Sequence, residues 1–365
     1  MTLGSVRSST PQSGDTDDFS LVLGGPLFQM FRRVHLTGNA LELVRRRIVA
    51  ISLFAWVPLL VLSTVENMVS GADVKVPFLY DIDVHIRFLI ALPLLIAAEL
   101  IVHERTRVVV GQFTSQRLVP DAIRERFISI LGSALRLRNS LVAEALIIAI
   151  VYIVGILVIW RSYMVLDVPT WYAVPGGGRV RPQLAGWWYF FVSLPVFQFI
   201  LLRWYFRLFI WTRFLWQVSR LPLAYAPLRP DRMGGIGFLS LVTHAFSPLL
   251  LAQGALLAGA LANRILFRGA VLTSFQLEAA AVVAVAVFVI LGPLLVFVAP
   301  LAAAKRIALR EYGNLARRYV DEFDDKWLRG GASRDEPRAG MDAHQLPAVH
   351  SAAASLFLLR RRLQD

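Results

Sequence analysis

The chain has 365 residues, of which 56% are hydrophobic, and its mean hydropathy is +0.59. This composition excludes a single water-soluble domain of that length, and it also excludes a disordered chain. The net charge is +13 and no cysteine is present, which excludes disulfides, thiolate nucleophiles and cysteine-based metal sites. The lipid bilayer is the natural solvent for such a chain.

Residues 1–47 precede the apolar part of the chain. They open with Ser, Thr, Gly and Asp and lack the apolar core of a cleavable signal peptide, so we expect a cytoplasmic tail. Further along, Phe28 and Phe31 stand beside Arg32 and Arg33. This pattern predicts a helix that lies in the membrane interface ahead of the first span.

Six apolar runs follow that can cross a bilayer as helices. A spanning helix needs about 20 apolar residues, and lipid offers no partner for unpaired backbone groups. We therefore predict an all-α integral membrane protein, a six-helix transmembrane bundle with amphipathic cytoplasmic helices. The predicted spans lie near residues 48–65, 86–102, 141–160, 187–202, 238–262 and 277–303.

The orientation follows from the charged residues between these runs, because cytoplasmic loops retain positive charge. With the amino terminus inside, 31 of the 38 Lys and Arg residues fall on the cytoplasmic side. Both termini are therefore predicted to be cytoplasmic, and topology together with anionic headgroups explains the net charge without a nucleic-acid partner. Arginine outnumbers lysine 35 to 3 and alanine is abundant, which favours a bacterial protein of the inner membrane.

Several cytoplasmic segments also have recognisable patterns. Pro120 and Asp121 give a helix start, and apolar residues recur after them at helical spacing. Residues 304–328 continue helically after the last span with mixed charges, which predicts a helix projecting into the cytoplasm. Residues 329–365 lack periodicity and end in basic residues, which predicts a disordered basic tail.

The most distinctive motif is a glycine-rich loop before the fifth span, which reads Pro230-Asp231-Arg232-Met233-Gly234-Gly235-Ile236-Gly237-Phe238-Leu239. Left-handed backbone and free amides at the helix start could hold a phosphate or lipid headgroup, with Asp231, Arg232, Gly234, Gly235 and Gly237 as candidates. The favoured alternative is structural, with Asp231 as a helix cap and the glycines allowing close packing. The motif resembles a loop of a family of uncharacterised bacterial multi-span membrane proteins. That resemblance implies the general layout and no known activity.

A second polar cluster, Asp81, Asp83 and His85, lies in the first external loop. If the segment is extended, alternate spacing aligns the three side chains, and they could hold a metal. The acidic pair is also similar to one in membrane glycosyltransferases that use lipid-linked sugars, which implies an enzyme. The favoured alternative is a solvated loop in which Asp81 or Asp83 starts the second helix. No catalytic residue and no cofactor is assigned.

Four polar side chains fall within or near the predicted spans, where a charge is costly: Glu99, Glu144, His244 and Gln253. Glu99 and Glu144 lie near the cytoplasmic boundary and can reach water or an arginine such as Arg207. His244 and Gln253 lie deeper. A lone polar residue in a bundle more often makes a hydrogen bond between helices than it binds a substrate.

Three classes of function remain. The first, which we favour, is a non-enzymatic membrane component that binds a cytoplasmic partner or an anionic lipid through its basic face. The second is a passive transporter or channel past the four polar side chains, and the third is an enzyme acting on a lipid-linked substrate. Hydrolase, ATPase and oxidoreductase signatures are absent from the sequence. The sequence does not fix the substrate or the oligomeric state.

Overall fold

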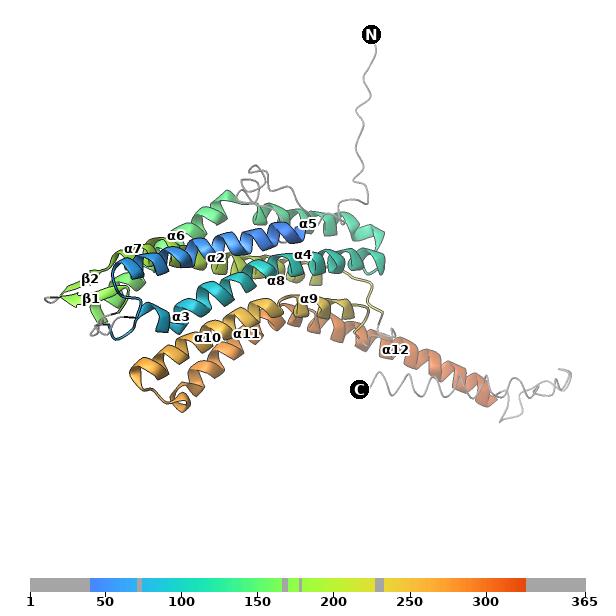
Figure 1. Ribbon diagram of the computed structural model, residues 1–365. Helices are drawn as coiled ribbons and strands as arrows, with labels where there is room; N and C mark the ends of the chain where they lie inside the picture. The colour runs from blue at the N-terminus through green and yellow to red at the C-terminus, as the bar shows by residue number, and fades with distance from the viewer. Residues whose placement is uncertain (1–39, 71–73, 166–169, 177–178, 227–232, 326–365) are drawn as a thin grey trace, which may run out of the picture.

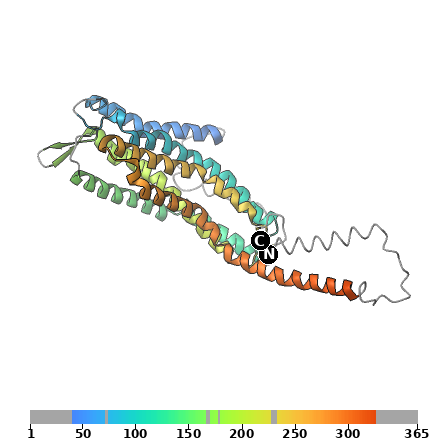
Figure 2. The same cartoon turned by 90° about the horizontal axis from the view of Figure 1, so that it is seen from below.

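Figure 1 shows a computed structural model of the chain, which describes residues 40–70, 74–165, 170–176, 179–226 and 233–325. This part of the chain is mostly helical, and its long helices run along a common direction to form an elongated bundle. A two-stranded hairpin lies at one end, the hairpin end, and a helix projects from the other, the α12 end (Figure 1, Figure 2). The predicted interfacial helix and the predicted basic tail lie outside the described residues.

The first half of the bundle runs to the hairpin end, back to the α12 end, and then to the hairpin end again (Figure 1). In chain order it comprises α2 (Ala40–Val65), α3 (Ile82–His85), a π-turn (Ile86–Ala91), α4 (Leu92–Ser115), α5 (Arg124–Arg138) and α6 (Leu141–Val165). α3, the π-turn and α4 form one continuous helix. α5 begins after the predicted Pro120-Asp121 start and buries Phe127, whose ring lies 5.9 Å from that of Phe113 and 6.2 Å from that of Phe214.

The second half comprises β1 (Ala173–Gly176), β2 (Arg179–Pro182), α7 (Leu184–Trp188), a π-turn (Tyr189–Ser193), α8 (Leu194–Ser219), α9 (Ser240–Ala245), α10 (Ser247–Arg268), α11 (Gln276–Leu295) and α12 (Val298–Phe323). The two strands are antiparallel. Two predicted runs are divided in the structure: 238–262 between α9 and α10, and 277–303 between α11 and α12. Pro300 in the first turn of α12 cannot continue the preceding helix, which explains the second division.

Two π-turns occur at corresponding places in two long helices, and a proline explains each of them. Proline lacks an N–H, and its ring clashes with the carbonyl four residues earlier. Pro93 and Pro195 each follow a leucine at the start of α4 and α8. The leucine N–H bonds instead to the carbonyl five residues earlier, which belongs to Arg87 in one helix and to Tyr189 in the other. π-Turns are frequent at functional sites.

In the described part of the chain, five helical segments are long and apolar enough to cross a membrane: Val44–Val65, Ile82–Ser115, Leu184–Ser219, Gly237–Arg268 and Leu272–Leu295. A sixth is obtained if Asp121–Arg138 and Leu141–Gly155, which meet at an angle of 43°, count as one bent span. The helical character predicted for the apolar runs is therefore confirmed, and the described chain is compatible with a membrane-embedded protein.

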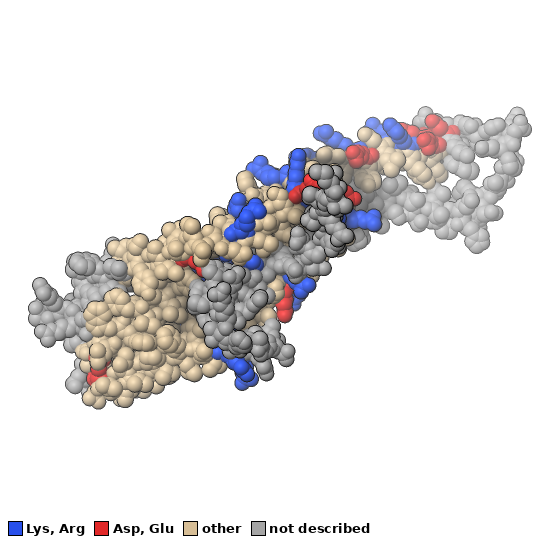
Figure 3. All heavy atoms as spheres, turned by 90° about the horizontal axis from the view of Figure 1, so that it is seen from above, with Lys and Arg blue, Asp and Glu red and all other residues tan. Residues whose placement is uncertain are grey.

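Lysine and arginine are unevenly distributed over the bundle. On the face shown in Figure 3 they gather over the α12 end and continue along α12, whereas the half towards the hairpin is nearly bare of them. The helices themselves are held together by apolar and aromatic packing. Trp204, which is fully buried, also donates a hydrogen bond from Nε1 to the carbonyl of Leu95 at 2.9 Å and so ties α8 to α4.

Candidate functional site

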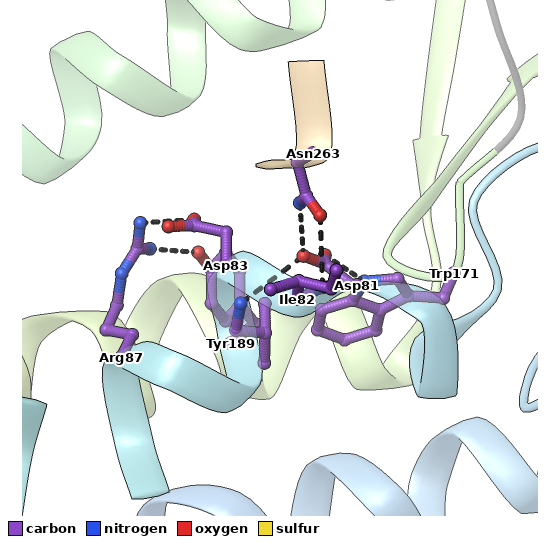
Figure 4. A network of polar contacts seen from close by, with 8 residues as sticks. Asp81, Ile82, Asp83, Arg87, Trp171, Tyr189 and Asn263 are labelled. Carbon is purple, nitrogen blue, oxygen red and sulfur yellow. Dashed lines mark hydrogen bonds and ion pairs between the residues drawn. The ribbon is translucent and has the colours of Figure 1, made fainter. Parts of the chain in front are cut away.

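A buried carboxylate organises the hairpin end of the bundle. Asp81 lies at the start of α3, is 5% exposed, and accepts hydrogen bonds from Val84 N at 3.3 Å and from Trp171 Nε1 at 2.8 Å. Asn263 on α10 donates to the same carboxylate at 2.6 Å and accepts from Ile82 N at 3.0 Å (Figure 4). Asp81 therefore joins α3, α10 and the segment before β1.

Arg87 forms an ion pair with the neighbouring carboxylate, Asp83, and connects the two π-turns through Tyr189. Arg87 contacts Asp83, one turn earlier on the same helix, and donates to the hydroxyl of Tyr189 (Figure 4). Arg87 and Asp83 are each 19% exposed at the side chain. The Arg87 guanidinium also lies 5.8 Å from the centre of the Phe197 ring. Arg87 and Tyr189, whose carbonyls accept the bonds that close the two π-turns, are therefore hydrogen-bonded to each other.

These polar groups face a cavity of about 590 Å³, the hairpin-side cavity, between α3, α8, α10 and α11. Its polar lining also includes Tyr172, Gln198 and Gln253. An apolar groove of about 320 Å³ between α8, α10 and α11 shares Gln253 and Val282 with it, so that the two spaces adjoin. Gln253 donates to the Tyr205 hydroxyl at 2.9 Å where they meet.

Aromatic residues pack beside the cavity at the hairpin end. The ring of Tyr172 stacks on that of Tyr189 at 6.1 Å, and burial raises the pKa of the Tyr172 hydroxyl. Gly186 on α7 permits this arrangement, because a Cβ at that position would lie 2.0 Å from the carbonyl oxygen of Tyr172. The segment before β1 therefore packs directly against the start of α7.

A second ionic cluster lies nearer the α12 end. Glu99 on α4 contacts Arg207 at 2.8 Å and Arg47 at 3.0 Å, and Arg203 lies 4.0 Å from Glu144. Arg207 is 4% exposed, and its guanidinium stacks over Trp204 at 4.9 Å. Counted over the described residues, the cluster has three arginines and two glutamates and so carries one net positive charge. It connects α2, α4, α6 and α8.

This cluster borders a second cavity of about 540 Å³, the arginine crevice, between α2, α4, α6 and α8. Arg47, Glu99 and Arg203 provide its charged lining, and most of the remainder is apolar. The two cavities use different faces of α8: Phe190 and Leu194 line the hairpin-side cavity, whereas their chain neighbours line the crevice. α8 therefore separates the two.

The predicted metal cluster is not formed. The segment is helical rather than extended, so the alternate spacing of Asp81, Asp83 and His85 does not align their side chains. His85 turns to α2, where its Nδ1 accepts from Trp56 Nε1 at 3.0 Å. Among the described residues, no group of three His, Cys, Asp or Glu side chains could hold a metal ion. The alternative is correct in part: Asp81 caps the helix by accepting from Val84 N, but its carboxylate is buried and not part of a solvated loop.

The four intramembrane candidates do not line one path. Gln253 faces the hairpin-side cavity, whereas Glu99 faces the arginine crevice on the other side of α8. Glu144 contacts Arg203 and His244 is exposed. The prediction that Glu99 reaches Arg207 is confirmed.

The glycine-rich loop is described in part. Asp231 and Arg232 lie outside the described residues, so their predicted roles in anion binding or capping stay predictions. Gly234 and Gly235 have φ values of 65° and 92°, and a Cβ on Gly234 would lie 2.9 Å from the side chain of Leu301 on α12. Left-handed backbone and close packing account for these two glycines. Gly237 begins a short 3₁₀ turn before α9.

Sequence reasoning missed Arg87, Tyr189, Asn263 and Arg47 as site residues. One signal in the sequence could have pointed to Arg87 and Tyr189, because each lies five residues before the leucine of a Leu-Pro pair. Comparison with known proteins finds no matching family model, no matching curated protein and no matching solved structure.

Proposed function

We propose that the protein is a non-enzymatic, six-span protein of the bacterial inner membrane that binds an anionic phospholipid of the inner leaflet in the arginine crevice. Both termini are then cytoplasmic and the hairpin end is external. The single observation that carries the proposal is a crevice with Arg47 and Arg203 in its lining and an otherwise mostly apolar wall.

The orientation is supported by the distribution of charge. Lys and Arg gather at the α12 end of the face in Figure 3, and 31 of the 38 fall in segments that this topology assigns to the cytoplasm. Positive charge is retained on the cytoplasmic side of membrane proteins. The sixth span in this arrangement is α6, which continues from α5 across the 43° bend.

The crevice has the charge that an anionic headgroup needs. Its lining contains two arginines and one glutamate, and the rest of the ionic cluster adds Arg207 and Glu144. Guanidinium groups bind phosphate through charge-assisted hydrogen bonds, and the net positive charge favours an anion over a neutral headgroup. The basic run that ends in Arg47 adds attraction to the anionic leaflet surface.

The crevice also has the length of one leaflet. From Arg203 at the charged end to Phe191 near the start of α8, the lining extends about 18 Å at ~1.5 Å per residue. A hydrocarbon core is ~30 Å thick, so each leaflet contributes ~15 Å. An acyl chain can therefore lie along the apolar wall while its headgroup stays at the arginines.

Binding of defined lipids to the purified protein tests the proposal. We expect phosphatidylglycerol to bind more tightly than phosphatidylcholine in titrations followed by native mass spectrometry. Arg203→Gln should lower the affinity for phosphatidylglycerol about tenfold, since it removes one charge-assisted contact. Arg46→Gln is the matched control, because Arg46 is exposed beside Arg47 and does not line the crevice.

Two results would count against lipid binding in the crevice. One is that Arg203→Gln removes no more phosphatidylglycerol binding than phosphatidylcholine binding. The other is an equal loss of affinity in Arg46→Gln and Arg203→Gln, since that would assign the effect to surface charge. Thermal unfolding of each variant without lipid reports whether the fold is retained.

A second candidate function, binding of a cytoplasmic protein, is favoured by α12. This helix projects from the bundle, and Tyr312, Leu315 and Tyr319 recur on one face with exposures of 39%, 61% and 43%. Apolar residues at this spacing suit an amphipathic helix of a partner. Leu315→Glu should abolish recovery of such a partner from native membranes, whereas Asn314→Glu should not. Equal recovery with both variants would eliminate this candidate.

The other two classes receive less support. A channel past Glu99 and Gln253 would have to cross α8, because the two side chains line separate cavities. An enzyme using the external acidic cluster would depend on Asp81, whose carboxylate already accepts three hydrogen bonds, and on His85, which faces α2. Flux through reconstituted vesicles that His244→Ala abolishes would revive the channel.

A further inference from the structure

The hairpin-side cavity supplies a polar end and the adjoining groove between α8, α10 and α11 supplies an apolar end, which together have the form of a lipid site. We propose that it binds one zwitterionic phospholipid with a primary amine, such as phosphatidylethanolamine, with the ammonium at Asp83 and the phosphate at Arg87. The acyl chain then lies in the groove between α8, α10 and α11. This site is separate from the arginine crevice, because the two cavities lie on different faces of α8.

The polar and apolar ends are arranged along the helix axis. Asn263, at the polar end, lies five residues before the end of α10, whereas Leu249 in the apolar groove lies near its start. The separation is about 21 Å at ~1.5 Å per residue. With the hairpin end external, this places the polar groups at the depth of the outer headgroups and the groove within the hydrocarbon. A lipid of the outer leaflet has this length and orientation.

Access from the bilayer is available beside α11. The most apolar window of that helix has only 11% of its residues buried, the smallest share among the five candidate spans. Val282 of α11 lines both the cavity and the groove. A chain can therefore enter beside α11 without displacing the tightly packed helices.

The charges at the polar end select the headgroup. The lining contains the carboxylates of Asp81 and Asp83 and the guanidinium of Arg87, so a headgroup with only negative charge meets net repulsion. A headgroup with both charges can extend the existing pair, because Asp83 accepts N–H donors and Arg87 binds phosphate oxygen. Gln198 Oε1 is a further buried acceptor without a donor among the described residues, which a ligand or water can supply.

Methylation of the headgroup amine distinguishes lipids that can donate a hydrogen bond to Asp83 from lipids that cannot. Phosphatidylethanolamine and phosphatidylcholine carry the same charges, but the quaternary ammonium of phosphatidylcholine has no N–H to donate to Asp83. The expected order of affinity is therefore phosphatidylethanolamine, then phosphatidylcholine, then phosphatidylglycerol. The arginine crevice predicts phosphatidylglycerol above phosphatidylcholine, so the two sites respond in opposite ways to the same lipids.

The test is titration of the delipidated protein with short-chain forms of the three lipids, followed by native mass spectrometry. Asp83→Asn and Arg87→Gln should each lower the affinity for phosphatidylethanolamine at least about tenfold. Arg264→Gln is the matched control, because Arg264 lies at the same end in an exposed pair with Glu278, 41% and 45% exposed. Arg203→Gln should leave phosphatidylethanolamine binding unchanged.

A steric variant keeps the test decisive if the charge variants unfold. Ala260 lines the cavity on α10, and Ala260→Trp should fill the path of the acyl chain and abolish binding while Asp83 and Arg87 remain. Unfolding without lipid is measured for each variant. Equal affinity for phosphatidylethanolamine and phosphatidylcholine would overturn the proposal, as would full binding by Ala260→Trp. Unchanged phosphatidylethanolamine binding in Asp83→Asn, Arg87→Gln and Ala260→Trp, with phosphatidylglycerol binding lowered in Arg203→Gln, would support the crevice and refute this site.

Discussion

Neutralising Glu99 should destabilise the bundle more than any exposed carboxylate does. Its carboxylate holds Arg207 at 2.8 Å and Arg47 at 3.0 Å, and Arg207 is 4% exposed at the side chain. Removing one partner of a buried ion pair costs about 3–5 kcal/mol, because the other charge is left uncompensated. Glu99→Gln should fall near the lower limit, about 3 kcal/mol, since the amide oxygen can still accept one hydrogen bond.

The assay is reversible unfolding in mixed detergent micelles, followed by tryptophan fluorescence, for a double-mutant cycle. Arg207→Gln should cost a similar amount, and the double variant should cost about 1–3 kcal/mol less than the sum of the two. Glu278→Gln is the control, because its pair with Arg264 is exposed and should contribute at most about 1 kcal/mol. Strict additivity, or a cost for Glu99→Gln no larger than that of the control, would refute the buried cluster.

Three further outcomes follow from the structure. Gly186→Ala should lower the free energy of unfolding by at least about 2 kcal/mol in the same assay, because the added Cβ would lie 2.0 Å from the Tyr172 carbonyl oxygen. A variant as stable as the wild-type protein would contradict that contact. Trp171→Phe should cost about 2 kcal/mol, since Asp81 loses a donor at 2.8 Å, and a cost near zero would mean that this bond is not formed. Burial raises the pKa of Tyr225 to about 12, so its phenol should titrate above its ordinary value in absorbance measurements. The folded state favours the neutral phenol, so the stability that Tyr225 contributes is present below pH ~10 and is lost as pH rises through 12.

The sequence predicts the helices well because lipid imposes a simple rule on them. A long apolar run has no alternative to a helix in hydrocarbon, so the runs could be found without tertiary information. The interruptions of these helices were harder to predict, since they depend on single prolines. Pro300 ends the last apolar run early, and Pro93 and Pro195 produce π-turns that periodicity alone does not predict.

The site residues were less accessible because they come together across long stretches of chain. Arg87 and Tyr189 are 102 residues apart, and Asp81 and Asn263 are 182 apart. Nothing in either local segment specifies the other. His85 was misplaced for a different reason: period-two spacing aligns side chains only in an extended strand, and residues 82–85 form a helix.

The central claim is that an anionic lipid lies in the arginine crevice. The most direct measurement places a photoreactive benzophenone amino acid at Tyr152, which lines the crevice, or at its neighbour Ile153, which is 58% exposed and does not. After illumination in native membranes, mass spectrometry identifies the lipid attached at each position. The account predicts that anionic phospholipid is enriched at position 152 relative to the bulk membrane, whereas position 153 reflects the bulk composition. Bulk composition at both positions would contradict it.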